Sequence, residues 1–195
     1  MSDLQTITKL RELTGAGMMD CKKALTEAKG DMDKAIEVLR KTGAAKAAKK
    51  MDEREVKEGI VYSYIHSNQK AGAMIELLCE TDFVARTDDY KALAHDLAMQ
   101  IVAMKPDYLL PENVPAEIIE KEKDIYREQL KKEGKPAEMI EKILEGKINK
   151  FYEDVCLMKQ AFVKDDKIKI EDLITQVVAK TGEKIQIGKF AGFTI

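Results

Sequence analysis

The chain has few of the residues on which catalytic and metal-binding chemistry usually depends. Its 195 residues include two histidines, three cysteines, four prolines and no tryptophan. Cys21, Cys79 and Cys156 are odd in number and widely spaced, which is typical of reduced thiols and not of a disulfide framework or a zinc site. His66 and His95 have no neighbour at a ligand spacing such as H-x-x-x-H. We therefore expect no metal ion and no cofactor.

The sequence also lacks a charge bias and long apolar runs. It has 33 Lys and Arg against 35 Asp and Glu, so it has no basic excess of the kind that non-specific nucleic-acid binding requires. No apolar run approaches the roughly 18 residues of a membrane span. Residues 1–4 have neither the basic nor the apolar part of a signal peptide. We expect a cytoplasmic protein that binds neither membranes nor nucleic acid directly.

Signatures of catalysis are missing as well. Neither G-x-S-x-G nor a Cys-His nucleophile pattern occurs. Residues 182–189 superficially suggest a phosphate-binding loop, but five residues separate Gly182 from Gly188, and Phe190 stands where Ser or Thr would bind magnesium. The alternation of apolar and polar residues over 184–195 favours a strand instead. We therefore expect that the chain is not an enzyme.

The first fifty residues have the pattern of three short helices. Ser2 and Gln5 predict a capping box at the start of the first helix, and the glycines within 14–17 end it. A second helical pattern covers 18–29, and a third begins at Asp31, which caps it. These segments predict a compact three-helix bundle.

A change of composition follows the bundle. Residues 41–50 carry no apolar stripe beyond alanine, so they are predicted to be a helical extension or a linker. The next strongly apolar segment begins at Gly59. We therefore place a domain boundary near residue 55, between an N-terminal domain with its linker (1–55) and a core domain (56–195).

The core domain mixes strands and helices without regular alternation, which predicts an α+β fold with a three-stranded antiparallel sheet packed by helices. The predicted strands are 59–66, 71–79 and 184–195, and the predicted helices are 88–104, 116–132, 137–152 and 170–180. The apolar stripe of the first of these helices includes Tyr90 and Met104. The second and third form a helical hairpin, whose stripe from Ile140 to Val155 is a candidate for packing on a second copy of the chain.

The segment from Cys79 to Arg86 lies at a predicted strand-to-helix corner, and its pattern allows two interpretations. In the first, Thr81 or Asp82 caps a helix and Phe83 turns into the core. In the second, the corner presents these side chains to a partner, because the flanking elements hold them in place. The local pattern alone favours the first interpretation.

Longer motifs favour the second interpretation. The signature LRELTGAGMMDCKKAL occupies residues 10–25, TDFVAR occupies 81–86, and QAFVKD occupies 160–165. These three stretches resemble the elongation factor Ts family, and the resemblance runs from the first helix to the last strand. It implies a ubiquitin-associated-like N-terminal bundle and a short family member with a single core subdomain.

The resemblance also implies a function: guanine-nucleotide exchange on elongation factor Tu in translation, by binding the GDP complex and disturbing its magnesium and phosphate site. Residues implied to contact the magnesium region are Thr81, Asp82, Phe83 and Val84. Residues implied to dock on the partner are Leu13, Thr14, Gly15, Ala16, Gly17, Met18, Met19, Asp20, Lys22 and Lys23. Short members of the family are dimeric, so a homodimer in a two-to-two complex is expected.

Two other hypotheses remain open. The first is a generic helical binding module that uses the N-terminal bundle on other partners and has no effect on any GTPase. The second is a nucleotide-dependent enzyme, which the missing phosphate loop disfavours.

Overall fold

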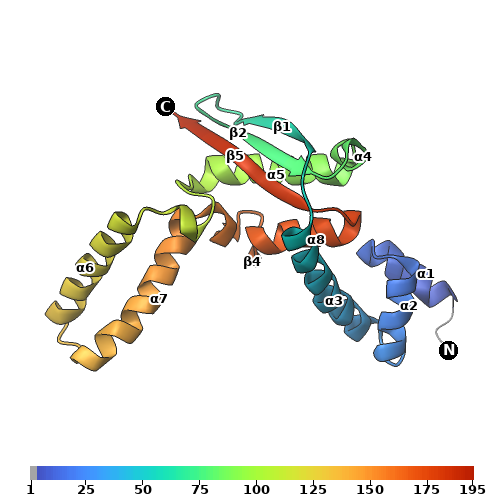
Figure 1. Cartoon of the computed structure of the whole chain (residues 1–195), viewed down its shortest axis with the longest axis horizontal. Coiled ribbons are helices and arrows are strands. Elements are labelled where there is room, and N and C mark those ends of the chain that lie inside the picture. The colour runs from blue at the N-terminus through green and yellow to red at the C-terminus, as the bar shows by residue number, and fades with distance from the viewer. Residues whose placement is uncertain (1–3) are drawn as a thin grey trace.

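The computed structural model describes residues 4–195, apart from the side chains of residues 44 and 46–53. The predicted capping residue Ser2 lies outside the described residues. The chain begins with three helices, α1 (Leu4–Thr14), α2 (Met18–Glu27) and α3 (Met32–Glu53). They enclose a small apolar core that includes Leu10 and Leu25 and is separate from the core around the sheet. The predicted three-helix bundle is therefore present at one end of the molecule (Figure 1).

Helix α3 continues from the bundle to the rest of the protein. Its 22 residues include the segment 41–50, so that segment is a helical extension and not a linker. At about 1.5 Å per residue, α3 is about 33 Å long. Its second half packs against α8 (Ile170–Thr181), where a Cβ added at Gly43 would lie 3.3 Å from the Ala179 Cβ.

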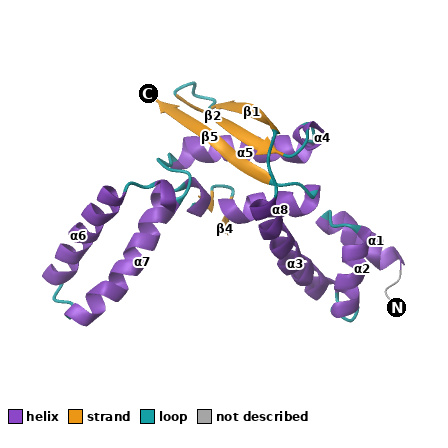
Figure 2. Cartoon of the chain, viewed as in Figure 1, coloured by secondary structure: helices purple, strands orange, loops and turns teal. Residues whose placement is uncertain are grey.

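A three-stranded antiparallel sheet is the centre of the core domain (Figure 2). It is formed by β1 (Glu58–Ile65), β2 (Ala71–Cys79) and β5 (Ile185–Thr194), with β2 between the other two. The segment that superficially suggested a phosphate-binding loop runs from the end of α8 at Gly182 into β5. The predicted α+β fold is confirmed.

Helices cover only one of the two faces of the sheet. Helices α5 (Asp88–Met104) and α8 cover one face, where alternate residues of β2 such as Ile75 and Leu77 are buried. Exposed apolar side chains lie on the opposite face, where Val61 of β1 and Met74 of β2 alternate with those buried residues. The predicted inward face of α5 is confirmed at Tyr90 but wrong at Met104, which is 45% exposed at the last residue of the helix.

The predicted helical hairpin, α6 (Ala116–Lys132) and α7 (Ala137–Val155), extends from the sheet as an arm (Figure 1). The α7 side chains Ile140, Leu144 and Ile148 are buried, as is Leu130 of α6. The middle of the predicted self-packing stripe is therefore occupied within one chain, and a second copy has no access to it. No helix in the described part of the chain is both long and apolar enough to cross a membrane.

Several short elements were not predicted. They are the 3-10 turns η1 (Pro111–Asn113) and η2 (Leu157–Lys159) and the strand pair β3 (Ala161–Phe162) and β4 (Asp165–Lys169). The helix that one interpretation placed after Thr81 is a separate single turn, α4 (Asp82–Ala85). A buried amide pair fixes the small hairpin of β3 and β4, because Gln100 Nε2 donates to Gln160 Oε1 at 3.1 Å and the Val163 N–H donates to Gln100 Oε1 at 2.8 Å. Elements of two to five residues are too short for a hydrophobic period to reveal.

Candidate functional site

The corner between β2 and α5 is fixed by hydrogen bonds at Thr81. The Thr81 N–H donates to Glu183 Oε2 at 3.0 Å, and its hydroxyl donates to Glu183 Oε1 at 2.6 Å. The thiol of Cys79 donates to the Thr81 carbonyl at 3.1 Å, and burial raises the pKa of that thiol. Thr81 is the N-cap of α4 in extended conformation, as one interpretation predicted, although its hydroxyl bonds to Glu183. The N–H, the hydroxyl and the carbonyl of Thr81 are therefore all hydrogen-bonded.

Phe83 projects from this corner into solvent with 80% of its surface exposed. The next two residues, Val84 and Ala85, are buried against the sheet. Because α4 makes a single turn, the face that carries Val84 and Ala85 inward leaves Phe83 pointing outward. The interpretation that placed Phe83 in the core is therefore wrong. A large exposed aromatic on a fixed corner is typical of a contact surface.

Asp82 lies beside Phe83 and pairs with Arg86 one turn later, with Nη2 and Oδ2 2.7 Å apart. The Arg86 side chain is largely exposed and that of Asp82 is 46% exposed, so this ion pair contributes at most about 1 kcal/mol. A partner that offers the carboxylate a better donor replaces Arg86 at little cost.

The predicted docking residues surround the turn between α1 and α2. Leu13 and Met19 are 64% and 63% exposed, and Met18, Lys22 and Lys23 are exposed beside them. Gly15 and Gly17 are exposed in the turn, whereas Thr14, Ala16 and Asp20 are partly buried. The turn thus presents three apolar side chains next to two lysines. Between them, Cys21 is buried, and this burial raises its pKa.

The turn and the corner are connected through α8. Gly15 has a φ of +67°, and a Cβ added there would lie 3.0 Å from Lys180 Cε. The Lys180 ammonium in turn binds the Asp89 carboxylate in the first turn of α5, at 2.7 Å. The docking turn and the Phe83 corner consequently lie at the same end of the molecule (Figure 1).

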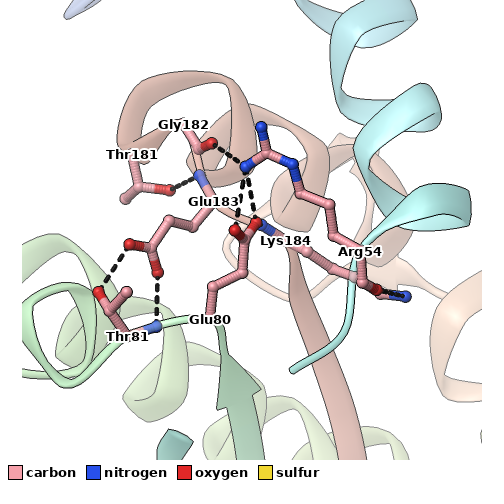
Figure 3. A network of polar contacts seen from close by, with 7 residues as sticks. All are labelled: Arg54, Glu80, Thr81, Thr181, Gly182, Glu183 and Lys184. Carbon is pink, nitrogen blue, oxygen red and sulfur yellow. Dashed lines mark hydrogen bonds and ion pairs between the residues drawn. The ribbon is translucent and has the colours of Figure 1, made fainter. Parts of the chain in front are cut away.

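Sequence reasoning missed Glu80, Glu183 and Arg54, which support the corner (Figure 3). The available signal was the strand pairing. Once β2 and β5 are neighbours with Cys79 opposite Ile185, the residues just beyond that pair must lie side by side.

The two histidines belong to aromatic contacts on the helix-covered face of the sheet. The Tyr62 hydroxyl lies 3.2 Å from His95 Nδ1, and the Tyr64 hydroxyl lies 3.1 Å from His66 Nδ1. Among the side chains described between residues 4 and 195, no three His, Cys, Asp or Glu gather closely enough to hold a metal ion.

Comparison with known proteins shows the family of the chain. The family model described as "Elongation factor TS" matches residues 5–178. A relative named elongation factor Ts from Fervidobacterium nodosum is 59% identical over 98% of this chain and 96% of its own length. A relative of the same name from Thermosipho melanesiensis is 55% identical over 100% of this chain and 99% of its own length. Another, from Carboxydothermus hydrogenoformans, is 53% identical over 98% of this chain and 88% of its own length. The chain therefore belongs to the elongation factor Ts family of translation elongation factors.

Proposed function

We propose that this chain is the guanine-nucleotide exchange factor of elongation factor Tu and acts in the cytoplasm. It binds the GDP complex, disturbs the magnesium and phosphate site, and promotes GDP release without catalysing a reaction itself. The observation that carries this proposal is Phe83, an almost fully exposed aromatic on a corner fixed by hydrogen bonds, within a chain of this family.

The mechanism is a competition between two ligands for one GTPase. A GTPase holds GDP and magnesium through many charge-assisted contacts. An exchange factor that binds the empty state more tightly than the filled state weakens GDP binding by the same factor, because linkage is reciprocal. Inserting Phe83 into the partner supplies about 2 kcal/mol of this difference. Asp82 adds a charged hydrogen bond, or repulsion, next to the phosphates.

The four residues of the corner have different tasks in this proposal. Phe83 and Asp82 face outward and contact the partner. Val84 is buried in the protein's own core and Thr81 is bound to Glu183, so these two position the corner.

The N-terminal domain, residues 1–55, docks on the nucleotide-binding domain of the partner through the turn between α1 and α2. Leu13, Met18 and Met19 supply apolar contact area, and Lys22 and Lys23 steer the approach to an acidic surface. The core domain, residues 56–195, delivers the Phe83 corner. Separate apolar cores for the bundle and the sheet support this division.

We further propose a homodimer that binds two partner molecules. The uncovered face of the sheet is the better candidate for its interface, since Val61, Ile65, Met74 and Phe193 are all exposed. An isologous contact would bury this patch against its own copy. Light scattering on Met74→Glu tests the surface: the variant should have half the mass of the wild type, whereas Met139→Glu on the exposed arm should not change the mass.

Release of fluorescent GDP from elongation factor Tu tests the exchange function. In stopped flow, adding the protein should accelerate release in proportion to its concentration until the partner is saturated. A generic binding module would leave the rate unchanged, and a nucleotide-dependent enzyme would consume nucleotide in the absence of the partner. Either result would refute the proposal.

A further inference from the structure

Three segments that are far apart in the sequence meet at the carboxylate of Glu80 (Figure 3). Arg54 Nη1 lies 3.0 Å from both Glu80 carboxylate oxygens and 3.4 Å from the Gly182 carbonyl oxygen. The Lys184 N–H donates to Glu80 Oε1 at 2.6 Å. The Lys184 ammonium donates to the Arg54 carbonyl at 2.9 Å. Each of the three segments is thus bound to the other two.

The carboxylate of Glu183 makes a similar contact in the opposite direction, to the residue that follows Glu80. Glu80 reaches from the end of β2 to the backbone of Lys184, and Glu183 reaches from the start of β5 to the backbone of Thr81. Cys79 and Ile185 are the last residues of the strand ladder here, so the two side chains continue the pairing beyond it. This exchange fixes the β2 exit relative to β5.

The contacts of Glu80 and Glu183 form a junction between the ends of β2 and β5. Arg54 connects the N-terminal domain to this junction. It is the first residue after α3, the helix that runs from the docking bundle to the core. Glu80 directly precedes Thr81 and stands three residues before Phe83. Because α3 also packs along α8, the bundle is connected to the root of the corner by one continuous helix and the contacts of Arg54.

Glu80, like Asp96, is more buried than the other carboxylates in the ion pairs of the described residues. Its side chain is 20% exposed and that of Arg54 is 46% exposed. Glu80 has both the guanidinium and a backbone N–H as donors, and charge-assisted hydrogen bonds to a partly buried carboxylate are stronger than exposed pairs. By contrast, Arg127 on the arm pairs with the exposed Asp124 and Glu141.

We propose that Arg54 and Glu80 are positioning residues for nucleotide exchange, which join the docking bundle to the Phe83 corner. When the bundle docks, this junction presents Phe83 at one fixed place on the partner. The proposal rests on the exchange function proposed above. Neither residue needs to touch the partner.

A positioning role and a merely structural role differ in what they change. Loss of the junction leaves the docking turn intact, so the protein concentration for half-maximal stimulation should change little. The corner keeps its hydrogen bonds to Glu183, but its position relative to the bundle is no longer fixed, so the maximal rate of GDP release at saturating protein should fall. A merely structural pair would instead lower the melting temperature and leave the rate per folded molecule unchanged.

The test is a concentration series of stopped-flow GDP release with Arg54→Ala, Glu80→Ala and the double variant. Each single variant should lower the maximal rate about fivefold, which corresponds to about 1 kcal/mol in the barrier. The double variant should be little slower than Glu80→Ala, since Glu80→Ala already removes the ion pair and leaves Arg54 only its 3.4 Å contact with the Gly182 carbonyl. Because only Nη1 of Arg54 makes the contacts, the ammonium of Arg54→Lys should restore part of the rate.

Arg127→Ala is the matched control, since it removes an arginine with two carboxylate partners far from the corner. It should exchange nucleotide at the wild-type rate. If the wild type accelerates GDP release and Arg54→Ala equals it, the exchange function stands and the positioning role is refuted. If the wild type has no effect on GDP release, both proposals are wrong. If Glu80→Ala fails to fold, the two Arg54 variants decide the question.

Discussion

Replacing Phe83 with alanine separates the contact role of this side chain from a structural one. With 80% of its surface exposed, Phe83 contributes little to the protein's own core. A buried phenylalanine typically costs 3–5 kcal/mol when it is truncated to alanine. We therefore expect Phe83→Ala to leave the free energy of unfolding within about 0.5 kcal/mol of the wild type, as for other exposed positions.

The same substitution should have a large effect on exchange. Burying a phenylalanine ring completely is worth about 1.5–3 kcal/mol, and Phe83 has four-fifths of its surface free for a partner to cover. About 2 kcal/mol is thus available. If about 1.4 kcal/mol of it acts in the transition state for GDP release, the stimulated rate falls about tenfold.

Thermal melts and stopped-flow GDP release on the same preparations measure both quantities. Met139→Ala is a suitable control, because it removes another exposed apolar side chain from the distant arm and should change neither quantity. Asp82→Ala should also slow release, though less, since its exposed charge is already paired with Arg86. A large drop in melting temperature with an unimpaired rate per folded Phe83→Ala molecule would refute the assignment.

Four further predictions concern buried residues of the core and the division into two domains. Val84→Ala should lower the free energy of unfolding in urea by about 2 kcal/mol, because Val84 is buried; an unchanged urea midpoint would contradict this. Burial raises the pKa of Tyr90, whose hydroxyl donates to the Leu77 carbonyl at 2.6 Å. The unfolded state therefore loses this proton first, and stability should fall as pH rises through about 10, less steeply in Tyr90→Phe. Burial raises the pKa of Cys156 to about 11, so a thiol reagent at neutral pH should react with this residue only after denaturation. A fragment of residues 56–195 should fold but bind elongation factor Tu much more weakly in calorimetry than the whole chain, and full affinity would exclude docking by the bundle.

The sequence predicted the elements whose hydrophobic period is long enough to read. An apolar, strand-like run within residues 71–79 identified a strand, and helical spacing over 88–104 identified the helix that covers the sheet. Gly182, with φ of +81°, ends α8 where the pattern predicted a stop. Along residues 41–50 the pattern left helix and linker open, because alanine and lysine favour a helix without indicating what it packs against.

The site was only partly predictable. The motif around Phe83 was visible, but its orientation depends on a single helical turn at 82–85, which is too short for a periodic pattern. The contact between Thr81 and Glu183 joins residues 102 positions apart, so no local signal reports it. The stripe on α7 shows a related limit, since a period identifies which face of a helix is buried and not which element covers it.

The number of residues in α3 sets the direction in which the bundle faces as well as its distance from the core. Because each residue of a helix turns the chain by about 100°, one residue inserted between Gly43 and Arg54 would rotate the bundle by that angle about the helix axis and shift it about 1.5 Å. The turn that carries Leu13 and Met19 would then face a different direction from Phe83, although every side chain in both surfaces was unchanged. Seven inserted residues would restore the facing to within about 20°, but about 10 Å farther away. The number of residues in this helix therefore specifies the relative direction of the two surfaces as strictly as the side chains specify their chemistry.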